Sequence, residues 1–230
     1  KCKACFYMEQ VEGIKFPSIP GFNINEATDI LLKRDFDKYR EIGEPHPFLV
    51  AKGRDFLIPF SHEHFELWTQ SLHFGAKDRL NFVDPKTNLK VGGGLDDVWL
   101  NINTNCLHIV DYKSTSQKSD KGPITLDDPW KASYKRQMDL YVWVLRKKGF
   151  HVDDVGYFLY CDGDRFSDYD FLSSTAASMN FKITLIDYKT NDTWIEPTLQ
   201  DISECLNESK RPLHSDYCEY GKFLTQSLNQ

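Results

Sequence analysis

Hydrophobic residues follow two periods along the chain, and the change between them predicts a mixed fold. In residues 23–40 they recur at near-helical spacing, and Asn23 or Asn25 can cap the segment, so we predict a helix there. Residues 64–72 give a second, short helix. From about residue 79 to residue 108 the pattern changes to short strands, which are interrupted by turn-forming residues at 84–88 and 101–105.

The second half of the chain continues this alternation of strands and helices. Residues 107–113 are predicted as a strand with an apolar centre, followed by a polar loop at 114–128 and by the best-defined helix, at 129–148. Strands at 155–161 and 181–187 and a closing helix at 194–207 complete the pattern. The order helix, three strands, helix, strand predicts an α/β fold with a mixed central sheet flanked by helices. Because no convincing linker interrupts it, we expect one domain over residues 1–230, with its core at about 79–190.

Composition and charge limit the classes of function. Hydrophobic residues make up 40% of the 230 residues, which is enough for a packed core. No apolar run approaches the ~20 residues of a membrane span and no signal peptide is recognised, so we expect no membrane partner and, by default, a cytoplasmic location. The first residue is Lys1 rather than Met, which suggests a trimmed start.

The net charge of −6 argues against a protein coated in nucleic acid, but the charge is unevenly distributed. Residues 112–148 contain nine Lys or Arg against four Asp, a net charge of +5 that leaves −11 for the rest. Fields are screened beyond about 8 Å at physiological salt, so this local basic segment matters more to a bound phosphate than the total charge does.

Two neighbouring predicted strands bring carboxylates and a lysine to one surface. Alternate side chains on a strand share a face, so Asp111 and Lys113 face one side while Tyr112 faces the other. Asp96 comes from the preceding strand and faces the same surface, whereas its neighbour Asp97 faces the opposite side. Asp96, Asp111 and the backbone carbonyl of Tyr112 can hold Mg²⁺ or Mn²⁺, while Lys113 can orient or deprotonate a water, or stabilise the pentacovalent phosphate. This is the apparatus of metal-assisted phosphodiester hydrolysis.

The helix at 129–148 adds groups that suit a phosphate or nucleotide. Gln137 and Tyr141 lie one turn apart and therefore share a face, and Lys135 and Arg136 add positive charge beside them. The triplet Asp-Tyr-Lys occurs a second time at residues 187–189, without a Gly-x-x-Asp strand before it or a Gln-x-x-x-Tyr helix after it. We interpret this second triplet as the solvated end of an amphipathic strand.

These residues and their order resemble the PD-(D/E)XK nuclease superfamily, specifically its RecB-like exonuclease branch. The similarity rests on residues 93–96, 111–113 and the pair Gln137 and Tyr141, and it covers about 93–160. It implies a restriction-endonuclease-like αβββαβ core, dependence on Mg²⁺ or Mn²⁺, and cleavage of DNA, in a setting such as repair or recombination. It also implies that Asp96 and Asp111 bind the metal and that Lys113 is the catalytic lysine.

The chain departs from that family pattern at two places. Many RecB-like members carry a metal-ligating His or acid on an early helix; the early helix here offers several charged residues without a clear equivalent, so we assign none as a ligand. Several members also hold an iron–sulfur cluster on one N-terminal and three C-terminal cysteines. Here the late run Cys218-Glu-Tyr-Gly221 lacks a second thiol, so we expect no such cluster. A zinc module built on Cys2 and Cys5 fails on ligand count.

Two classes of function remain open at this point. The first is a metal-dependent nuclease that acts on DNA, and the second is a catalytically inactive nucleic-acid-binding or scaffolding module on the same fold. The joint presence of Asp96, Asp111 and Lys113 favours the nuclease, because an inactive module has no chemical need for the lysine.

Overall fold

The computed structural model describes residues 2–17, 21, 23–69, 79–117 and 122–228. Contacts divide the chain into two compact units. Unit 1 comprises Lys1–Gly21, Asp84–Leu89 and Thr193–Gln230, and unit 2 comprises Phe22–Val83 and Lys90–Asp192. The expectation of a single domain stays a prediction.

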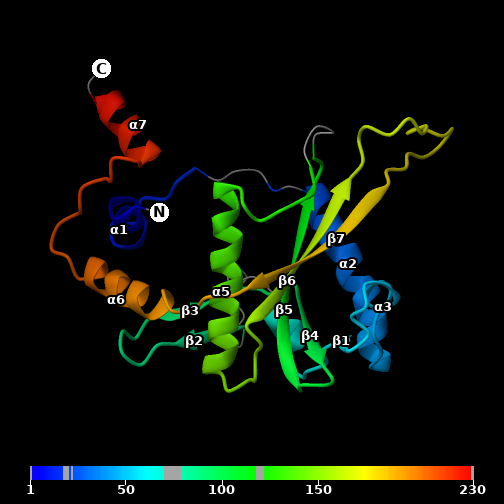
Figure 1. Cartoon of the computed structure of the whole chain (residues 1–230). Coiled ribbons are helices and arrows are strands. Elements are labelled where there is room, and N and C mark those ends of the chain that lie inside the picture. Colours follow the sequence, from blue (N-terminus) through cyan, green and yellow to red (C-terminus); the bar gives the residue numbers. More distant parts are fainter. Residues whose placement is uncertain (1, 18–20, 22, 70–78, 118–121, 229–230) are drawn as a thin grey trace. The chain divides into compact units, whose positions relative to one another are not determined.

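Unit 2 contains a five-stranded mixed sheet (Figure 1). Its order is β1 (Leu57–Pro59), β4 (Asp97–Asn101), β5 (Cys106–Thr115), β6 (Val155–Gly163) and β7 (Phe181–Lys189). Only β5 and β6 run parallel, while the other neighbours are antiparallel. A parallel pair needs a crossover connection, and here α5 (Ala132–Lys147), entered through a 3₁₀ turn at Pro129–Lys131, provides it.

Helices cover both faces of this sheet (Figure 1). Helix α2 (Asn23–Ile42) packs Phe36 against Trp99, Tyr112 and Leu159, which all point to one face of the sheet. On the opposite face α5 approaches β6 closely, since a Cβ on Gly156 would lie 2.5 Å from the sulfur of Met138. The two-residue period of the strands therefore sends successive side chains into different surroundings, which decides where each candidate site residue lies.

Smaller elements complete unit 2. They are the helices α3 (Pro47–Ala51) and α4 (Phe65–Trp68), and a separate two-stranded sheet of β2 (Asn81–Val83) and β3 (Lys90–Gly92). Helix α3 begins with Pro47 in its first turn, and His46 caps it by accepting a hydrogen bond from the Phe48 N–H at 3.0 Å.

Unit 1 is helical, with α1 (Lys3–Gln10), α6 (Ile195–Leu206) and α7 (Glu219–Leu228). Its first and last segments are joined by polar contacts: the Tyr7 hydroxyl donates to the Glu208 carbonyl at 3.1 Å, and Arg211 pairs with Glu12. Cys2, Cys5, Cys218 and Ala4 form a small buried cluster with Phe16 packed against it.

The coarse sequence prediction is confirmed, because the fold is a mixed α/β arrangement with a central mixed sheet between helices. The helices predicted at 23–40, 129–148 and 194–207 are present with shifted ends, whereas α1, α3, β1 and α7 were missed. Asp96, predicted on a strand, instead directly precedes β4. Residues 70–72 of the predicted second helix lie outside the described residues.

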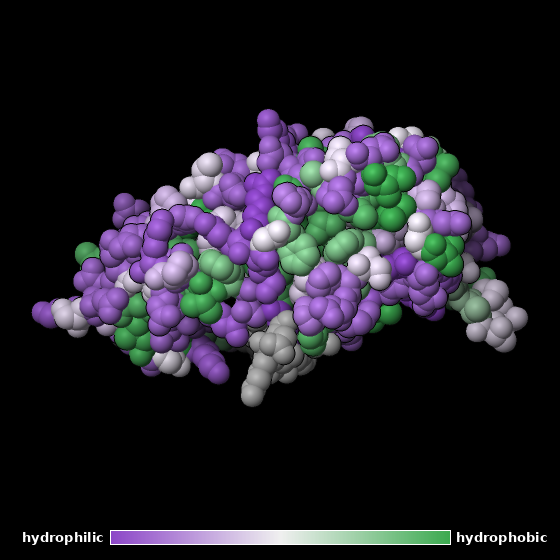
Figure 2. Space-filling model, turned by 90° about the horizontal axis from the view of Figure 1, so that it is seen from below, coloured by the Kyte–Doolittle hydropathy of each residue, from purple (hydrophilic) through white to green (hydrophobic). Residues whose placement is uncertain are grey.

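The surface shown in Figure 2 is mainly polar, with hydrophobic residues in smaller groups between polar ones. Exposed hydrophobic residues of this kind are normal on folded proteins. Within the described part of the chain, no helix has the length and apolar character needed to cross a bilayer.

Candidate metal and nucleic-acid site

Asp96 and Asp97 point to opposite sides, as their spacing predicts. Asp97 is fully buried beneath α2, where its carboxylate pairs with Arg40 at 2.5 Å and accepts the Tyr112 hydroxyl at 2.7 Å. Asp96 instead accepts the backbone N–H of Tyr112 at 2.7 Å. This hydrogen bond ties Asp96 to β5 one residue after Asp111, so the two carboxylates of the predicted metal site lie next to one another.

Asp111 and Lys113 share the face of β5 opposite the α2 core. Asp111 is 1% exposed, and its carboxylate forms an ion pair with the Lys113 ammonium. The Lys113 side chain is 15% exposed, and its ammonium lies 4.6 Å from the ring centre of Tyr134 on α5. The structure thus brings Asp96, Asp111 and Lys113 into one half-buried cluster.

A third carboxylate, which we had not assigned, approaches this cluster from α2. The charges of Asp96 and Lys113 both act on Asp29, and Ser114, next to Lys113 on β5, hydrogen-bonds to it. Burial and the charge of Asp96 raise the pKa of Asp29 to about 7. Thr28 and Ser114 hydrogen-bond to each other and hold this end of α2 against β5.

The remaining carboxylates respond to the same crowding. Burial, together with the charge of Asp111, raises the pKa of Asp96 to about 7. Burial also raises the pKa of Asp111, although Lys113 opposes this effect. Burial alone would lower the pKa of Lys113, but Asp111 and Asp96 raise it, so Lys113 carries its charge. When all three acids around the one ammonium are ionised, an excess of negative charge results.

That excess fits a divalent cation. Both oxygens of Asp111 are buried, and the groups that face them are the Lys113 ammonium and the Asp96 carboxyl, which can donate only while it is protonated. Oδ1 of Asp29 is likewise buried and accepts no hydrogen bond from a described residue. Buried carboxylate oxygens without donors are costly unless a cation or water satisfies them. Hard oxygen donors in this number suit Mg²⁺ or Mn²⁺. The proposed part of the Tyr112 carbonyl in the ligand set stays a prediction.

Helix α5 presents the predicted amide and phenol beside the carboxylates. Gln137 Nε2 donates to the Tyr141 hydroxyl at 3.0 Å. Burial raises the pKa of Tyr141 to about 12, and the charges of Asp96 and Asp111 contribute. A Cβ on Gly93 would lie 2.9 Å from the Tyr141 hydroxyl, so the glycine before Asp96 leaves the space that this ring fills.

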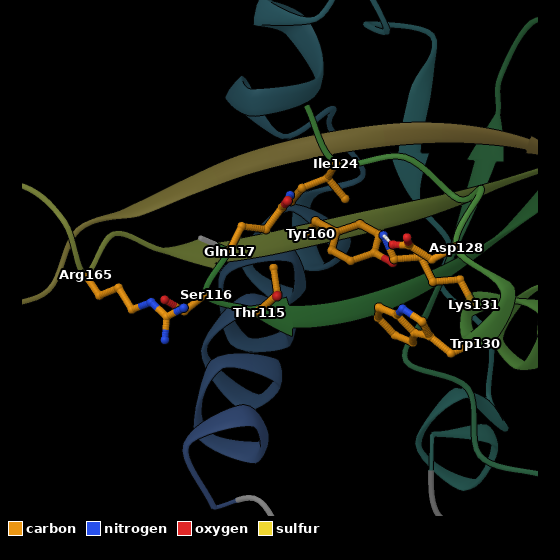
Figure 3. A pocket seen from close by; sticks show the side chains of 9 residues that line it. All are labelled: Thr115, Ser116, Gln117, Ile124, Asp128, Trp130, Lys131, Tyr160 and Arg165. Atoms are coloured by element: carbon orange, nitrogen blue, oxygen red, sulfur yellow. Dashed lines mark ion pairs between the residues drawn. The ribbon is translucent and has the colours of Figure 1, made fainter. Parts of the chain in front are cut away.

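A pocket of about 320 Å³ continues along β5 beyond Lys113 (Figure 3). Thr115, two residues further along the same strand, lies in its wall, and Trp130 is 57% exposed there. Lys131 also lines the pocket but is already engaged by Asp128 at 2.9 Å, whereas Arg165 is exposed. These lining residues were not singled out from the sequence.

The two basic residues predicted to bind substrate lie on the first turns of α5. Arg136 is exposed and Lys135 is half-buried. Neither forms an ion pair with any residue that the structure describes, so both charges are available to a phosphate.

The second Asp-Tyr-Lys triplet lies at the end of the edge strand β7. Asp187 pairs with Arg54 at 2.5 Å and is partly exposed, Tyr188 donates to Asp139, and Lys189 is exposed. The triplet lies at a solvated strand end as expected, but an ion pair between Asp187 and Lys189 is not formed, because Arg54 pairs with Asp187 instead.

Unit 1 contains a second set of metal-ligand side chains. Cys2, Cys5, His214 and Cys218 have ligand atoms that all lie within 4.8 Å of one another. The exclusion of a zinc module on ligand count was therefore wrong. His214 was missed, although its spacing of four residues from Cys218 was a usable signal.

No protein-family model, curated protein or solved structure gives a significant match to this chain.

Proposed function

We propose that unit 2 is a metal-dependent nuclease that hydrolyses phosphodiester bonds of DNA, of the PD-(D/E)XK type and its RecB-like exonuclease branch. The observation that carries the proposal is the cluster of Asp96, Asp111 and Lys113, in which two adjacent buried carboxylates share one charged lysine. Without the intervening short elements α3, α4, β2 and β3, the order is α2, β1, β4, β5, α5, β6, with β5 and β6 parallel, and it supports the αβββαβ core implied by the resemblance.

The ligands in this proposal are Asp96 and Asp111, joined by Asp29. A bound Mg²⁺ or Mn²⁺ supplies Lewis-acid chemistry, which polarises the phosphate and acidifies a water. Lys113 keeps its proton in these surroundings, so its contribution is to orient the attacking water and to offset negative charge that develops on the phosphate. Asp111 holds the lysine in place through their ion pair.

The groups around the cluster suit a nucleic-acid strand. Exposed Trp130 offers a face on which a base can stack, and Arg136 and Arg165 offer charge to phosphates. In this proposal Gln137 and Tyr141, which are hydrogen-bonded to each other on α5, contact the nucleic-acid strand near the carboxylates. None of these contacts requires a particular base sequence, which agrees with a nuclease without strong sequence preference.

Cleavage of labelled oligonucleotides tests the proposal. Single- and double-stranded substrates, blocked and unblocked at their ends, are incubated with Mg²⁺, Mn²⁺ or EDTA. We expect cleavage with metal and none with EDTA. Lys113→Ala should lower the rate by roughly 10²–10⁴-fold, which is typical of a positioned proton-transfer or charge-stabilising group.

Lys189→Ala is the matched control, since it changes the same residue of the second triplet on an exposed strand end. It should leave cleavage close to that of the unchanged protein. An equal loss from both substitutions would remove the reason for assigning the catalytic role to Lys113. Binding of every substrate without cleavage under either metal would favour the inactive binding module.

A further inference from the structure

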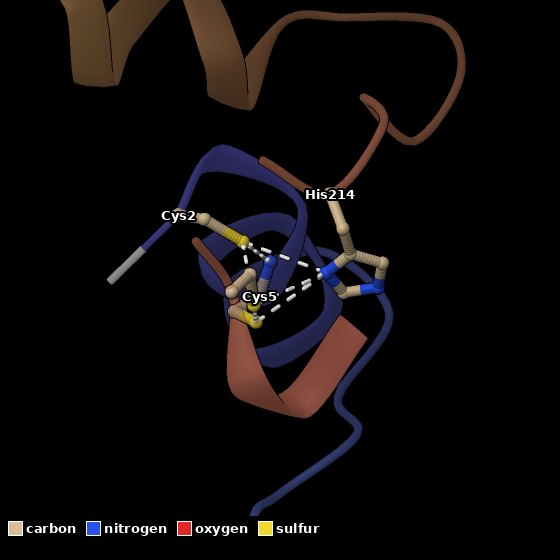
Figure 4. Close-up of side chains that lie close together, drawn as sticks. Cys2, Cys5 and His214 are labelled. Carbon is tan, nitrogen blue, oxygen red and sulfur yellow. Dashed lines mark hydrogen bonds between the residues drawn. The ribbon is translucent and has the colours of Figure 1, made fainter. Parts of the chain in front are cut away.

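The two ends of unit 1 meet at a compact group of sulfur and nitrogen atoms (Figure 4). Sγ of Cys218 lies 3.4 Å from Sγ of Cys2 and 3.3 Å from Sγ of Cys5. Nδ1 of His214 lies 3.5 Å from Cys2, 3.6 Å from Cys5 and 3.6 Å from Cys218. One imidazole nitrogen and three thiols therefore surround a single point.

These separations match the edges of a tetrahedron around one ion. With zinc–sulfur bonds of about 2.3 Å and zinc–nitrogen bonds of about 2.0 Å, a regular tetrahedron places two sulfurs about 3.8 Å apart and a sulfur and nitrogen about 3.5 Å apart. The three nitrogen–sulfur distances agree with this, and the two sulfur–sulfur distances to Cys218, 3.4 Å and 3.3 Å, are about 0.4–0.5 Å shorter than the ideal edge. A disulfide has sulfurs about 2.05 Å apart, and it would leave one thiol and the histidine unexplained.

Backbone N–H groups favour the thiolate forms of Cys2 and Cys218. The Cys5 N–H donates to Cys2 Sγ at 3.4 Å, and the Gly221 N–H donates to Cys218 Sγ at 3.3 Å. Cys2 caps α1, and Cys218 directly precedes α7, so both sulfurs lie at the positive ends of helices. Such outer hydrogen bonds orient metal ligands and stabilise their charge.

Gly221 explains why the fourth ligand is a histidine. A Cβ at position 221 would lie 2.6 Å from both Cβ and Cγ of His214. A cysteine at 221 would thus compete for the space that the histidine takes. The missing thiol is replaced by an imidazole, and all four ligands converge on one point. An iron–sulfur cluster instead distributes its cysteine ligands over several iron atoms.

We propose that Cys2, Cys5, His214 and Cys218 bind one Zn²⁺ ion that fastens the first segment of unit 1 to its last. The four protein ligands leave no open position, which marks a structural rather than a catalytic site. The hydrophobic cluster at this place is small and consists of three of the ligands, Ala4 and Phe16. The bound ion would therefore supply stability that this small cluster does not provide.

Metal analysis of the purified chain tests this inference. We expect one zinc per chain, and the same amount in an Asp111→Asn variant, which separates this site from the carboxylate cluster. Replacement by Co²⁺ should give the visible and near-ultraviolet bands of tetrahedral thiolate coordination. Cys218→Ser should lose most of the zinc and become sensitive to proteolysis between α6 and α7.

Cys205→Ser is the matched control, because Cys205 is buried in the same unit and its thiol donates to the Lys3 carbonyl, while it does not belong to the group of four ligands. It should retain the zinc. If Cys218→Ser does not fold, treating the unchanged chain with a chelator should release zinc and expose the same cleavage point. The inference is overturned by stoichiometric iron and sulfide, by a disulfide among these cysteines, by absence of zinc after supplementation, or by equal loss in the control.

Discussion

Asp96 and Asp97 are adjacent in the sequence but lie on opposite sides of the sheet. Replacing each in turn by asparagine therefore distinguishes a residue of the candidate metal site from a residue of the buried core. Asp97 accepts hydrogen bonds from Arg40 and the backbone of Val98 on one oxygen, and from Trp99 and Tyr112 on the other. Asparagine keeps the shape but has one acceptor oxygen and no charge. Asp97→Asn therefore breaks a buried ion pair and leaves donors facing an amide N–H₂ group.

The structure sets the expected size of this loss. Asp97 is fully buried and the Arg40 side chain is 9% exposed, and removal of one partner from such a pair typically costs about 3–5 kcal/mol. Arg40 keeps a second partner, Asp37, at 3.0 Å, so we expect the lower half of the range, about 3–4 kcal/mol. Asp96→Asn should instead leave the stability of the metal-free protein unchanged or raise it, because its surroundings already disfavour the charged form.

Urea unfolding at pH 8 in EDTA measures both effects. With a denaturant slope of about 1–3 kcal/mol per molar, Asp97→Asn should lower the midpoint by at least about 1 M. Asp96→Asn should retain or raise the midpoint and lose metal-dependent cleavage. Equal midpoints for the two variants, or a loss below about 1 kcal/mol for Asp97→Asn, would refute the assignment of the two carboxylates to different faces.

Three further results are expected. The double substitution of Lys135 and Arg136 by Ala should weaken binding to all oligonucleotides alike. The slope of log affinity against log salt should become shallower by about one unit for each phosphate that is no longer neutralised, measured by fluorescence anisotropy at about 50–200 mM salt. Unchanged binding would mean that these residues form only a solvated helix face. Gly93→Ala should displace the Tyr141 ring and reduce turnover more than stability, because the added Cβ would lie 2.9 Å from that ring; unchanged turnover would contradict the close packing. The metal-free protein should lose stability as the pH rises from about 4 to about 7. The pKa of the Asp29 carboxyl is raised in the folded protein, so this group stabilises the fold only while it is protonated. A similar slope in Asp29→Asn would show that Asp29 is not responsible.

Residues within one element were predictable because their relative positions follow from backbone periodicity. The two-residue period of a strand places Asp111 and Lys113 together and sends Tyr112 to the opposite face. The turn of a helix likewise brings Gln137 to Tyr141, which the hydrogen bond between them confirms.

Residues that meet only through tertiary packing could not be found in this way. Asp29 joins the cluster because α2 packs its first turns against β5, and no local pattern separates it from other acids on that helix. His214 lies far in sequence from Cys2, so the two halves of the sulfur site give a complete ligand set only after folding. Short elements such as β1 could not be predicted either, because three residues are too few to show a periodic pattern.

The central claim is that Asp96 and Asp111 form one cation site, and Mn²⁺ located by its anomalous X-ray scattering tests it most directly. Crystals of the unchanged chain soaked in Mn²⁺ should show a peak within ordinary coordination distance of both carboxylates, and crystals of Asp111→Asn should lack it. Absence of Mn²⁺ from both carboxylates, or a peak that survives Asp111→Asn unchanged, would contradict the account.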